Sequence, residues 1–434
     1  MRRQLSLTTP FAVLAASLIL VACGTGDSDS SSNDSGGGKS AAGAVKGGPG
    51  VDVAAKTIRV GDINALTGPA SALGKPVAAG HRAFFKAMNA NGGIDGWKVR
   101  LTIKDSGYQP QQAVQIYRAV RNDVALLNSF GSPPTKAIQS LFDKDQLVTT
   151  PASFDSVWGA DPAIAAVGTP YSYDIANVLD YYTKSGKDKP KIGIIYQNDE
   201  YGQDGLRGYK AAADKLGFDD VSRQTFKAGD TEFTAQIQKL KAAGAQAVVV
   251  TALPSSTGPI IGTAATLGFK PQWILQGPAF LEQLITKDGS LKATPTPIAA
   301  ALKGALVTSF SAAWGDPNAP GMKDVVAHHD EYEPGAPPSI YFALAYAAAK
   351  VQAAILKKAI DGGDLSRAGI LKAKQSLGKV DLGGISPDPT YSDKAAPPST
   401  KSLITRIDPS VDGFLKPVKA DYGSDVADGL GTGK

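Results

Sequence analysis

Few side chains in this sequence are of the types that carry catalysis or bind metal ions. The chain has three histidines, at positions 81, 328 and 329, and one cysteine, Cys23. His328, His329 and Asp330 are of metal-ligating types, but adjacent residues on a helix point in different directions. We therefore expect a solvated helix face there, and His81 at a core edge or at the surface. No Gly-x-Ser-x-Gly, P-loop or His-Glu-x-x-His pattern is present. The sequence predicts a protein that is not an enzyme and that holds no metal and no cofactor.

The surroundings of Cys23 indicate a lipid attachment site instead. Arg2 and Arg3 precede an apolar-rich stretch at 11–21, which is shorter than the roughly 20 residues of a membrane span. The residues Leu20-Val21-Ala22-Cys23 resemble the lipobox of bacterial lipoproteins. That resemblance implies a signal peptide at 1–22, a lipid on the Cys23 thiol, and anchoring to the outer face of the cytoplasmic membrane. An ordinary signal peptide with a chance cysteine, or twin-arginine export, are the alternatives.

The composition is that of an ordinary globular protein. Hydrophobic residues make up 43% of the chain and charged residues 20%. The net charge is +5, to which Arg2 and Arg3 contribute two, so no nucleic-acid partner is expected. An acylated Cys23 would leave no thiol for a disulfide, and the length is sufficient for two or three domains held by their own cores.

Residues 23–56 are rich in glycine and serine. Such a tract buries too little apolar surface to offset its ordering entropy, and it predicts a flexible linker with an end-to-end distance of roughly 30 Å. A disordered N-terminus without a tethering role predicts the same behaviour.

From residue 57 onward, strand and helix patterns alternate. The first series has expected strands at 58–63, 99–103, 125–127 and 147–150 and helices at 77–90, 111–123 and 135–144. The second has strands at 191–196, 221–226, 247–251 and 272–275 and helices at 204–216, 233–243 and 259–267. A strand at 304–308, a long helix at 340–360 and a strand at 403–407 follow. Two such α/β units predict parallel sheets whose carboxyl ends face a cleft between two lobes.

Several segments, in order, resemble one family. They are Ala65-Leu66-Thr67-Gly68-Pro69 with Gly74, residues 89–96 (Asn-Ala-Asn-Gly-Gly-Ile-Asp-Gly), Lys104-Asp105 with Gln112-Ala113-Val114, Thr150-Pro151-Ala152, and 198–202 (Asn-Asp-Glu-Tyr-Gly). Over about 57–408 the chain resembles the extracytoplasmic branched-chain amino-acid (leucine/isoleucine/valine) binding proteins of ABC importers.

The resemblance implies a type I periplasmic-binding fold of α/β class, with two doubly wound parallel-sheet lobes joined by a three-strand hinge. Lobe 1 would comprise 57–174 and 302–383, and lobe 2 would comprise 175–301 and 384–434, with hinge motion near 174, 302 and 384. The function implied is capture of a small-molecule ligand in the cleft by a monomer that delivers it to an ABC permease and its ATPase subunits. A ligand-sensing receptor component of the same fold is the alternative.

The resemblance also places candidate ligand-binding residues. Ser132 and the pair Ala152 and Ser153 match positions that hold the ligand carboxylate, and Thr135 is expected to begin a helix whose free N–H groups favour an anion. Helix N-capping is the alternative role for Ser132 and Thr135. Further candidates are Tyr201, which matches a tyrosine over the ligand, and Leu73 and Leu253, which lie near side-chain contact positions.

Two candidate positions depart from the family pattern. Phe154 stands where a threonine is expected, and Ala279 stands where an acid would pair with the ligand ammonium. A buried ammonium without a carboxylate partner costs roughly several kcal/mol. Either another acid therefore takes the place of the one missing at position 279, or the ligand is not an α-amino acid. Asp199, Glu200 and Glu282 are the candidate acids. We therefore predict an amino acid or an apolar, aromatic or aliphatic carboxylate, unless the alignment near Pro278 is shifted by a residue or two.

Overall fold

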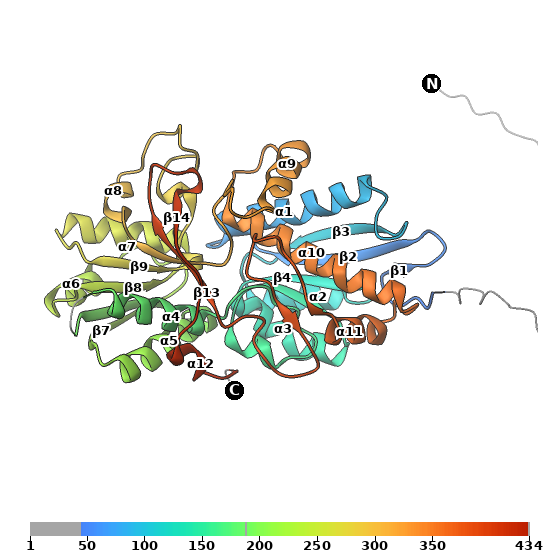
Figure 1. The fold of residues 1–434 in the computed structure, drawn as a ribbon, viewed down its shortest axis with the longest axis horizontal. Helices are drawn as coiled ribbons and strands as arrows, with labels where there is room; N and C mark the ends of the chain where they lie inside the picture. The colour runs from blue at the N-terminus through green and yellow to red at the C-terminus, as the bar shows by residue number, and fades with distance from the viewer. Residues whose placement is uncertain (1–44, 187–188, 433–434) are drawn as a thin grey trace, which may run out of the picture. The chain divides into compact units, whose positions relative to one another are not determined.

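The structure is a computed structural model, and it describes residues 45–186 and 189–432 (Figure 1). The predicted signal peptide, Cys23 and the linker up to residue 44 lie outside the described residues. Residues 45–56, predicted as the end of the linker, instead join the first lobe. Strand β1 (Val51–Asp52) pairs antiparallel with β2 (Thr57–Asn64), and the Lys46 N–H donates to the Gly363 carbonyl at 2.9 Å. Backbone pairing and the partly buried Val51 explain why a polar, glycine-rich segment is ordered here.

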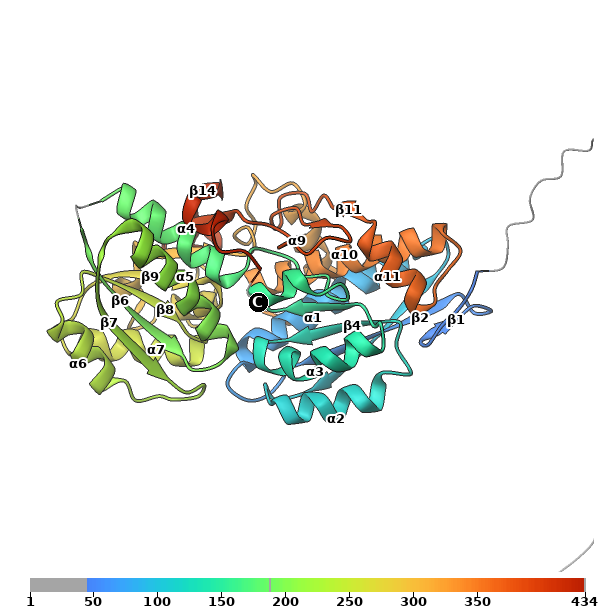
Figure 2. The same cartoon turned by 90° about the horizontal axis from the view of Figure 1, so that it is seen from below.

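The first sheet is built on parallel strands. Its order is β3-β2-β4-β5, with β1 at the start of β2. The further strands are β3 (Lys98–Asp105), β4 (Leu126–Phe130) and β5 (Thr149–Ala152). Helices α2 (Pro110–Val120) and α3 (Ser132–Lys144) cover one face, and α10 (Ile340–Asp361) lies on the other with α1 (Ser71–Ala90) packed against it (Figure 2). Helix α11 (Arg367–Gln375) packs beside α10, and α9 (Met322–Tyr332) beside α1.

The second sheet has the order β14-β13-β10-β9-β8-β6-β7. The parallel strands are β6 (Lys191–Gln197), β7 (Asp219–Phe226), β8 (Ala247–Thr251), β9 (Gln272–Gln276) and β10 (Leu306–Ser309). Strands β13 (Ser402–Ile407) and β14 (Leu415–Tyr422) complete one edge antiparallel. The helices are α4 (Tyr171–Lys184), α5 (Glu200–Leu216), α6 (Thr234–Ala242), α7 (Pro254–Thr266), α8 (Ala299–Leu302) and α12 (Asp425–Asp428). Every residue of β8 is buried, as an apolar strand covered on both faces requires. The α/β class and the two parallel sheets are confirmed.

The connections between the lobes fall later than predicted at two of three points. Strand β10 pairs with β9 and so belongs to the second sheet, which moves the second connection from near 302 to beyond Ser309. Strand β12 (Thr390–Tyr391) pairs with β11 (Gly378–Lys379), and the Tyr391 hydroxyl donates to the Ala166 carbonyl at 2.7 Å. The third connection therefore lies between β12 and β13 rather than near 384. Helix α4 packs against α5, so the first connection precedes Tyr171.

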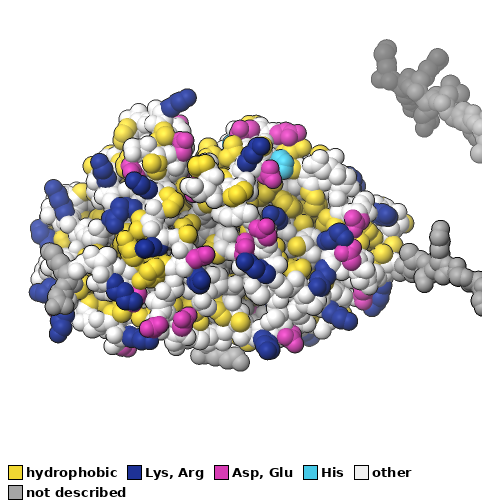
Figure 3. Space-filling model, viewed as in Figure 1, with side chains coloured by type: hydrophobic (Ala, Val, Ile, Leu, Met, Phe, Trp, Pro, Cys, Tyr) yellow, Lys and Arg dark blue, Asp and Glu magenta, His cyan; other side chains and the backbone are white. Residues whose placement is uncertain are grey.

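Helix α10 is long and apolar enough to cross a membrane by length and composition alone. In the structure most of its residues are buried inside the protein, as in the core helix of a globular domain. Its close contact with α1 depends on Gly80, where an added Cβ would lie 2.3 Å from the Phe342 carbonyl oxygen. Cationic and anionic side chains are interspersed over the face in Figure 3, in agreement with the small net charge.

Candidate functional site

A small cavity lies where the carboxyl ends of both sheets face each other. Its volume is about 30 Å³. The first lobe contributes residues at or just after the ends of β3, β4 and β5, together with residues of α1 and α10. The second lobe contributes residues that follow β6, β8, β9 and β10, together with the first residue of α4. The lining consists of Leu73, Tyr108, Phe130, Gly131, Ser132, Ala152, Phe154, Tyr171, Tyr201, Leu253, Pro278, Phe310, Tyr341 and Leu344. This is the place where open parallel sheets bind ligands.

Aromatic residues from both lobes make up seven of the fourteen lining residues. Phe154 stacks on Phe310 with ring centroids 5.3 Å apart, and Tyr171 meets Tyr201 edge-on at 4.8 Å. Tyr341 from α10 packs edge-on against Phe310 at 5.1 Å. No lysine, arginine, aspartate or glutamate lines the cavity. The site is therefore suited to an apolar group and offers only hydroxyls and backbone atoms to a polar one.

Six of the nine predicted ligand-binding residues line this cavity: Leu73, Ser132, Ala152, Phe154, Tyr201 and Leu253. The other three lie behind the wall. The Thr135 hydroxyl bonds to Ser129 at 2.9 Å, Ser153 bonds to Ser132 at 2.7 Å, and Ala279 is fully buried beside Pro278 in a 3₁₀ turn (Gly277–Ala279).

Eight lining residues were not predicted. Tyr108, Gly131, Pro278 and Phe310 come shortly after strands, and that position at the carboxyl end of a parallel strand was a signal available in the sequence. Tyr341 and Leu344 come from α10, where helical periodicity alone does not distinguish a cleft-facing position from a core position.

The helix start at the anion-binding end differs from the prediction. Helix α3 begins at Ser132, not at Thr135, and the Thr135 N–H donates to the Gly131 carbonyl at 3.1 Å. Pro133 and Pro134 have no N–H, so Ser132 supplies the only backbone donor among the first three residues of α3. The predicted cluster of free N–H groups was therefore wrong. No side chain caps this helix, which also excludes the capping role.

None of the three candidate acids lines the cavity. Asp199 caps α5 by accepting from the Gly202 N–H at 3.1 Å, and it accepts from the Tyr108 hydroxyl at 3.3 Å. Glu282 is fully buried and accepts from the Ile340 N–H at 2.8 Å, and burial raises the pKa of its carboxyl to about 7. Glu200 lines a separate hollow. The cavity therefore has no carboxylate in its wall to pair with an ammonium.

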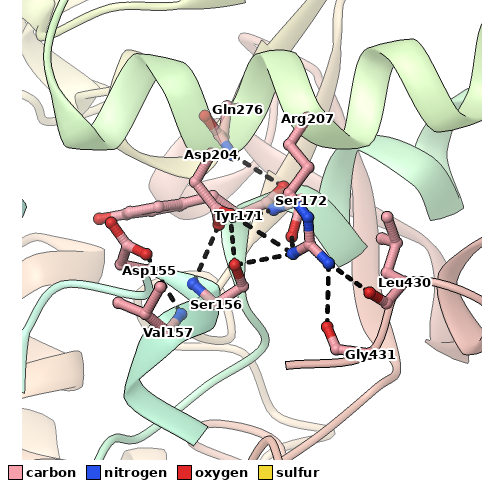
Figure 4. A network of polar contacts seen from close by, with 10 residues as sticks. All are labelled: Asp155, Ser156, Val157, Tyr171, Ser172, Asp204, Arg207, Gln276, Leu430 and Gly431. Atoms are coloured by element: carbon pink, nitrogen blue, oxygen red, sulfur yellow. Dashed lines mark hydrogen bonds and ion pairs between the residues drawn. The ribbon is translucent and has the colours of Figure 1, made fainter. Parts of the chain in front are cut away.

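A polar network beside the cavity joins the two lobes (Figure 4). Asp204 of α5 accepts from both the N–H and the hydroxyl of Ser156, which follows β5, at 3.1 and 2.5 Å. It also accepts from the Ser172 N–H at 3.1 Å. Arg207 donates to the Ser156 hydroxyl at 2.8 Å and reaches the backbone carbonyls of Leu430 and Gly431 (Figure 4). On the α7 side of the cleft, the Ser255 hydroxyl donates to the Pro69 carbonyl at 3.0 Å. The structure thus has its lobes in contact around the cavity.

The histidines serve packing and internal pairing. His81 is buried with Asp62, at 2.9 Å between Nδ1 and the carboxylate. His329 is also buried, against Trp314 and Phe342, so the predicted solvated face was wrong for this residue. Within 45–186 and 189–432, no group of three or more potential metal ligands occurs.

Comparison with known proteins agrees with this architecture. Residues 57–412 match the family described as periplasmic binding protein. A Leu/Ile/Val-binding protein homolog from Brucella melitensis biotype 1 is 30% identical over 204 residues, which are 44% of this chain and 53% of that relative. The chain thus spans about half the length of this curated relative.

Two solved structures extend the match to nearly the whole chain. A fatty acid ABC transporter substrate-binding protein from Thermomonospora curvata superposes with a TM-score of 0.81 at 27% identity, covering 89% of this chain and 97% of that one. A branched chain amino acid ABC transporter protein from Thermus thermophilus with bound valine gives a TM-score of 0.74 at 18% identity, covering 88% and 98%. Because the family match exceeds half of the sequence, the chain belongs to the periplasmic binding protein family, whose members, including the Leu/Ile/Val-binding proteins, bind solutes and are not enzymes.

Proposed function

We propose that this chain is the extracytoplasmic solute-binding component of an ABC importer and that its interlobe cavity takes an apolar carboxylate. The observation that carries the proposal is the composition of the wall: aromatic and aliphatic side chains from both lobes, a serine hydroxyl at one end, and no charged side chain. An α-amino acid would place its ammonium in the cavity without a carboxylate partner, which costs roughly several kcal/mol. A carboxylate without an ammonium avoids that cost.

The carboxylate end of the ligand would lie at Ser132 and Tyr171. Ser132 lines the cavity at the start of α3 and offers its hydroxyl and the one backbone N–H of the first three helix residues to an anion. Burial raises the pKa of the Tyr171 phenol, which keeps its hydroxyl protonated as a donor. The structural neighbour from Thermomonospora curvata is a fatty acid substrate-binding protein, which supports an apolar acid for a chain 27% identical to it.

The cavity volume supports binding by opening and closing. A space of about 30 Å³ holds about two water molecules, so a solute enters only when the lobes part. The solute would then touch Phe154 from one lobe and Tyr201 from the other and so favour the closed form over the open one. The closed form would dock on a permease, with ATP hydrolysis in partner subunits.

The location follows from Cys23. A lipid on its thiol would hold the chain, as a monomer, at the outer face of the cytoplasmic membrane. Replacement by Cys23→Ser should move the protein from the membrane fraction to the medium or periplasm, whereas a wild-type chain in the soluble fraction would contradict anchoring.

The ligand class is tested on the purified chain without residues 1–22. Small molecules released by heat denaturation are identified by mass spectrometry, and then benzoate, 4-methylpentanoate, octanoate and leucine are titrated calorimetrically. The proposal expects a tight apolar acid that is recovered unchanged after incubation. Leucine as the tightest ligand, or conversion of a bound acid to a product, would overturn it.

A further inference from the structure

A second and larger cavity lies within the first lobe, separate from the interlobe cavity. Its volume is about 170 Å³, and it is lined by residues of the 3₁₀ helix η1 (Ser156–Ala160), α11, β12 and the proline-rich segment that follows β12. The lining includes Trp158, Ile164, Lys374, Thr390, Tyr391 and Ser392. The two cavities share no lining residue.

Lys374 of α11 is the unusual member of this wall. The residue is only 6% exposed, and within the described parts of the chain its ammonium has no hydrogen bond and no ion pair. The Nζ atom of Lys374 lies over the ring of Tyr391, 5.7 Å from the ring centroid. Burial lowers the pKa of the Lys374 ammonium to about 8, although the charge of Asp161 acts in the opposite direction. The Lys374 side chain lines the cavity, and no carboxylate of the described residues lies within ion-pair distance of its ammonium, so an anionic ligand in the cavity would supply a direct counter-ion.

The other charged groups at the cavity are Asp161, Asp393 and Lys394. Asp161 is already engaged, because its carboxylate accepts from the Ala163 N–H at 2.9 Å and from the Gln139 amide at 2.6 Å. Two carboxylates near one buried ammonium disfavour a polyanion such as phosphate. Trp158, Ile164 and Tyr391 supply an apolar surface, and the volume is close to the roughly 150 Å³ of a cavity known to hold benzene.

We propose that this cavity binds a small organic monocarboxylate, with its carboxylate on the Lys374 ammonium and its apolar body between Trp158, Ile164 and Tyr391. Thr390 and Ser392 line the same cavity, and a hydroxyl of either residue would be a donor to the carboxylate. The segment 390–398 forms one side of the site and so gains a role beyond linking the lobes. This site is independent of the ligand proposed for the interlobe cavity.

The direct test is the titration of the Lys374 ammonium by NMR on the chain labelled with ¹³C-lysine, with benzoate as the probe. Without benzoate, one lysine Cε signal should titrate near pH 8, and it should be absent from Lys374→Met. Saturating benzoate should raise that midpoint by about one unit, because an anion stabilises the charged form. An unchanged midpoint at benzoate concentrations that saturate the interlobe cavity would overturn the site.

Variants separate the two cavities. Lys374→Met keeps the apolar length of the side chain, and calorimetry should show the loss of one benzoate equivalent, whereas Lys372→Met, on the exposed side of the same helix, should leave the stoichiometry unchanged. Ser132→Ala should weaken only the interlobe site and leave the Lys374 response intact. Equal benzoate stoichiometry in Lys374→Met and wild type would contradict the proposal. If Lys374→Met does not fold, Lys374→Gln and the wild-type titration still decide.

Discussion

The hydroxyl oxygens of Ser132 and Ser153 lie 2.7 Å apart at the end of the interlobe cavity, joining the segments that follow β4 and β5. The Trp158 indole N–H donates to the Ser153 oxygen at 3.2 Å. Either hydroxyl can be the donor in the Ser132–Ser153 contact, and when Ser153 donates, the Ser132 hydrogen is free for a ligand. In that arrangement the Ser132 hydroxyl, which lines the cavity, is a donor to the anionic end of a solute.

Removal of that donor should weaken carboxylate binding. Ser132→Ala is expected to reduce the affinity for the tightest apolar acid about tenfold, because one hydrogen bond to a charged group is lost. Calorimetry measures the change, and Ser410→Ala, an exposed serine in the second lobe, is the control. Unchanged affinity in Ser132→Ala would show that the carboxylate binds elsewhere.

The ring of Tyr201, rather than its hydroxyl, should contribute to the ligand contact. The hydroxyl donates to the Ala252 carbonyl at 3.3 Å, and the ring lines the cavity beside Tyr171. Tyr201→Phe should change the affinity for an apolar acid by less than about threefold, whereas Tyr201→Ala should reduce it more than about tenfold through lost apolar contact. Equal losses in both variants would assign the effect to the hydroxyl.

Ligand affinity should rise as the pH falls from 8 to 6. Burial and then the charge of Asp204 across the lobe interface raise the pKa of Asp155 to about 7, and burial also raises the pKa of Asp204. In an open form these carboxyls would return toward their ordinary pKa near 4, so closure takes up a proton between about pH 4 and pH 7. The apparent dissociation constant should fall about tenfold from pH 8 to pH 6.

The charges facing Asp155 also include Lys136 and Glu200. Asp155→Asn should flatten the pH profile. Asp143→Asn is the control, because burial and Asp161 raise the pKa of Asp143 to about 7 within the first lobe, away from the interface. If the pH dependence of affinity persists in Asp155→Asn but disappears in Asp143→Asn, protonation of Asp155 is not its cause.

The contact between α1 and α10 should not tolerate a side chain at Gly80. Gly80→Ala would place a Cβ 2.3 Å from the Phe342 carbonyl oxygen, and the unfolding free energy should fall by about 1–3 kcal/mol. Gly335→Ala, where an added Cβ has no neighbour within 4 Å, should have little effect. Urea unfolding of the two variants makes the comparison, and equal stabilities would argue against tight packing of the two helices.

The sequence predicted the fold better than the site. Buried strands such as β6 and β8 have long apolar runs, so their number and parallel arrangement could be read from the pattern. Lobe boundaries could not be read in this way, because β10 pairs with β9 through contacts that the alternation does not specify. Tyr341 was missed because helical periodicity does not separate a cleft-facing position from a core position, and its contact with Phe310 depends on how the two lobes meet.

The most direct measurement compares two solutes that differ only in an ammonium group. Leucine and 4-methylpentanoate share the same branched chain and carboxylate, and both are titrated calorimetrically into the chain without residues 1–22. The cavity wall has no carboxylate to pair with the leucine ammonium, and an unpaired buried ammonium costs more than about 1 kcal/mol. We therefore expect 4-methylpentanoate to bind at least about tenfold more tightly than leucine. Tighter binding of leucine would contradict the assignment of this cleft to apolar carboxylates.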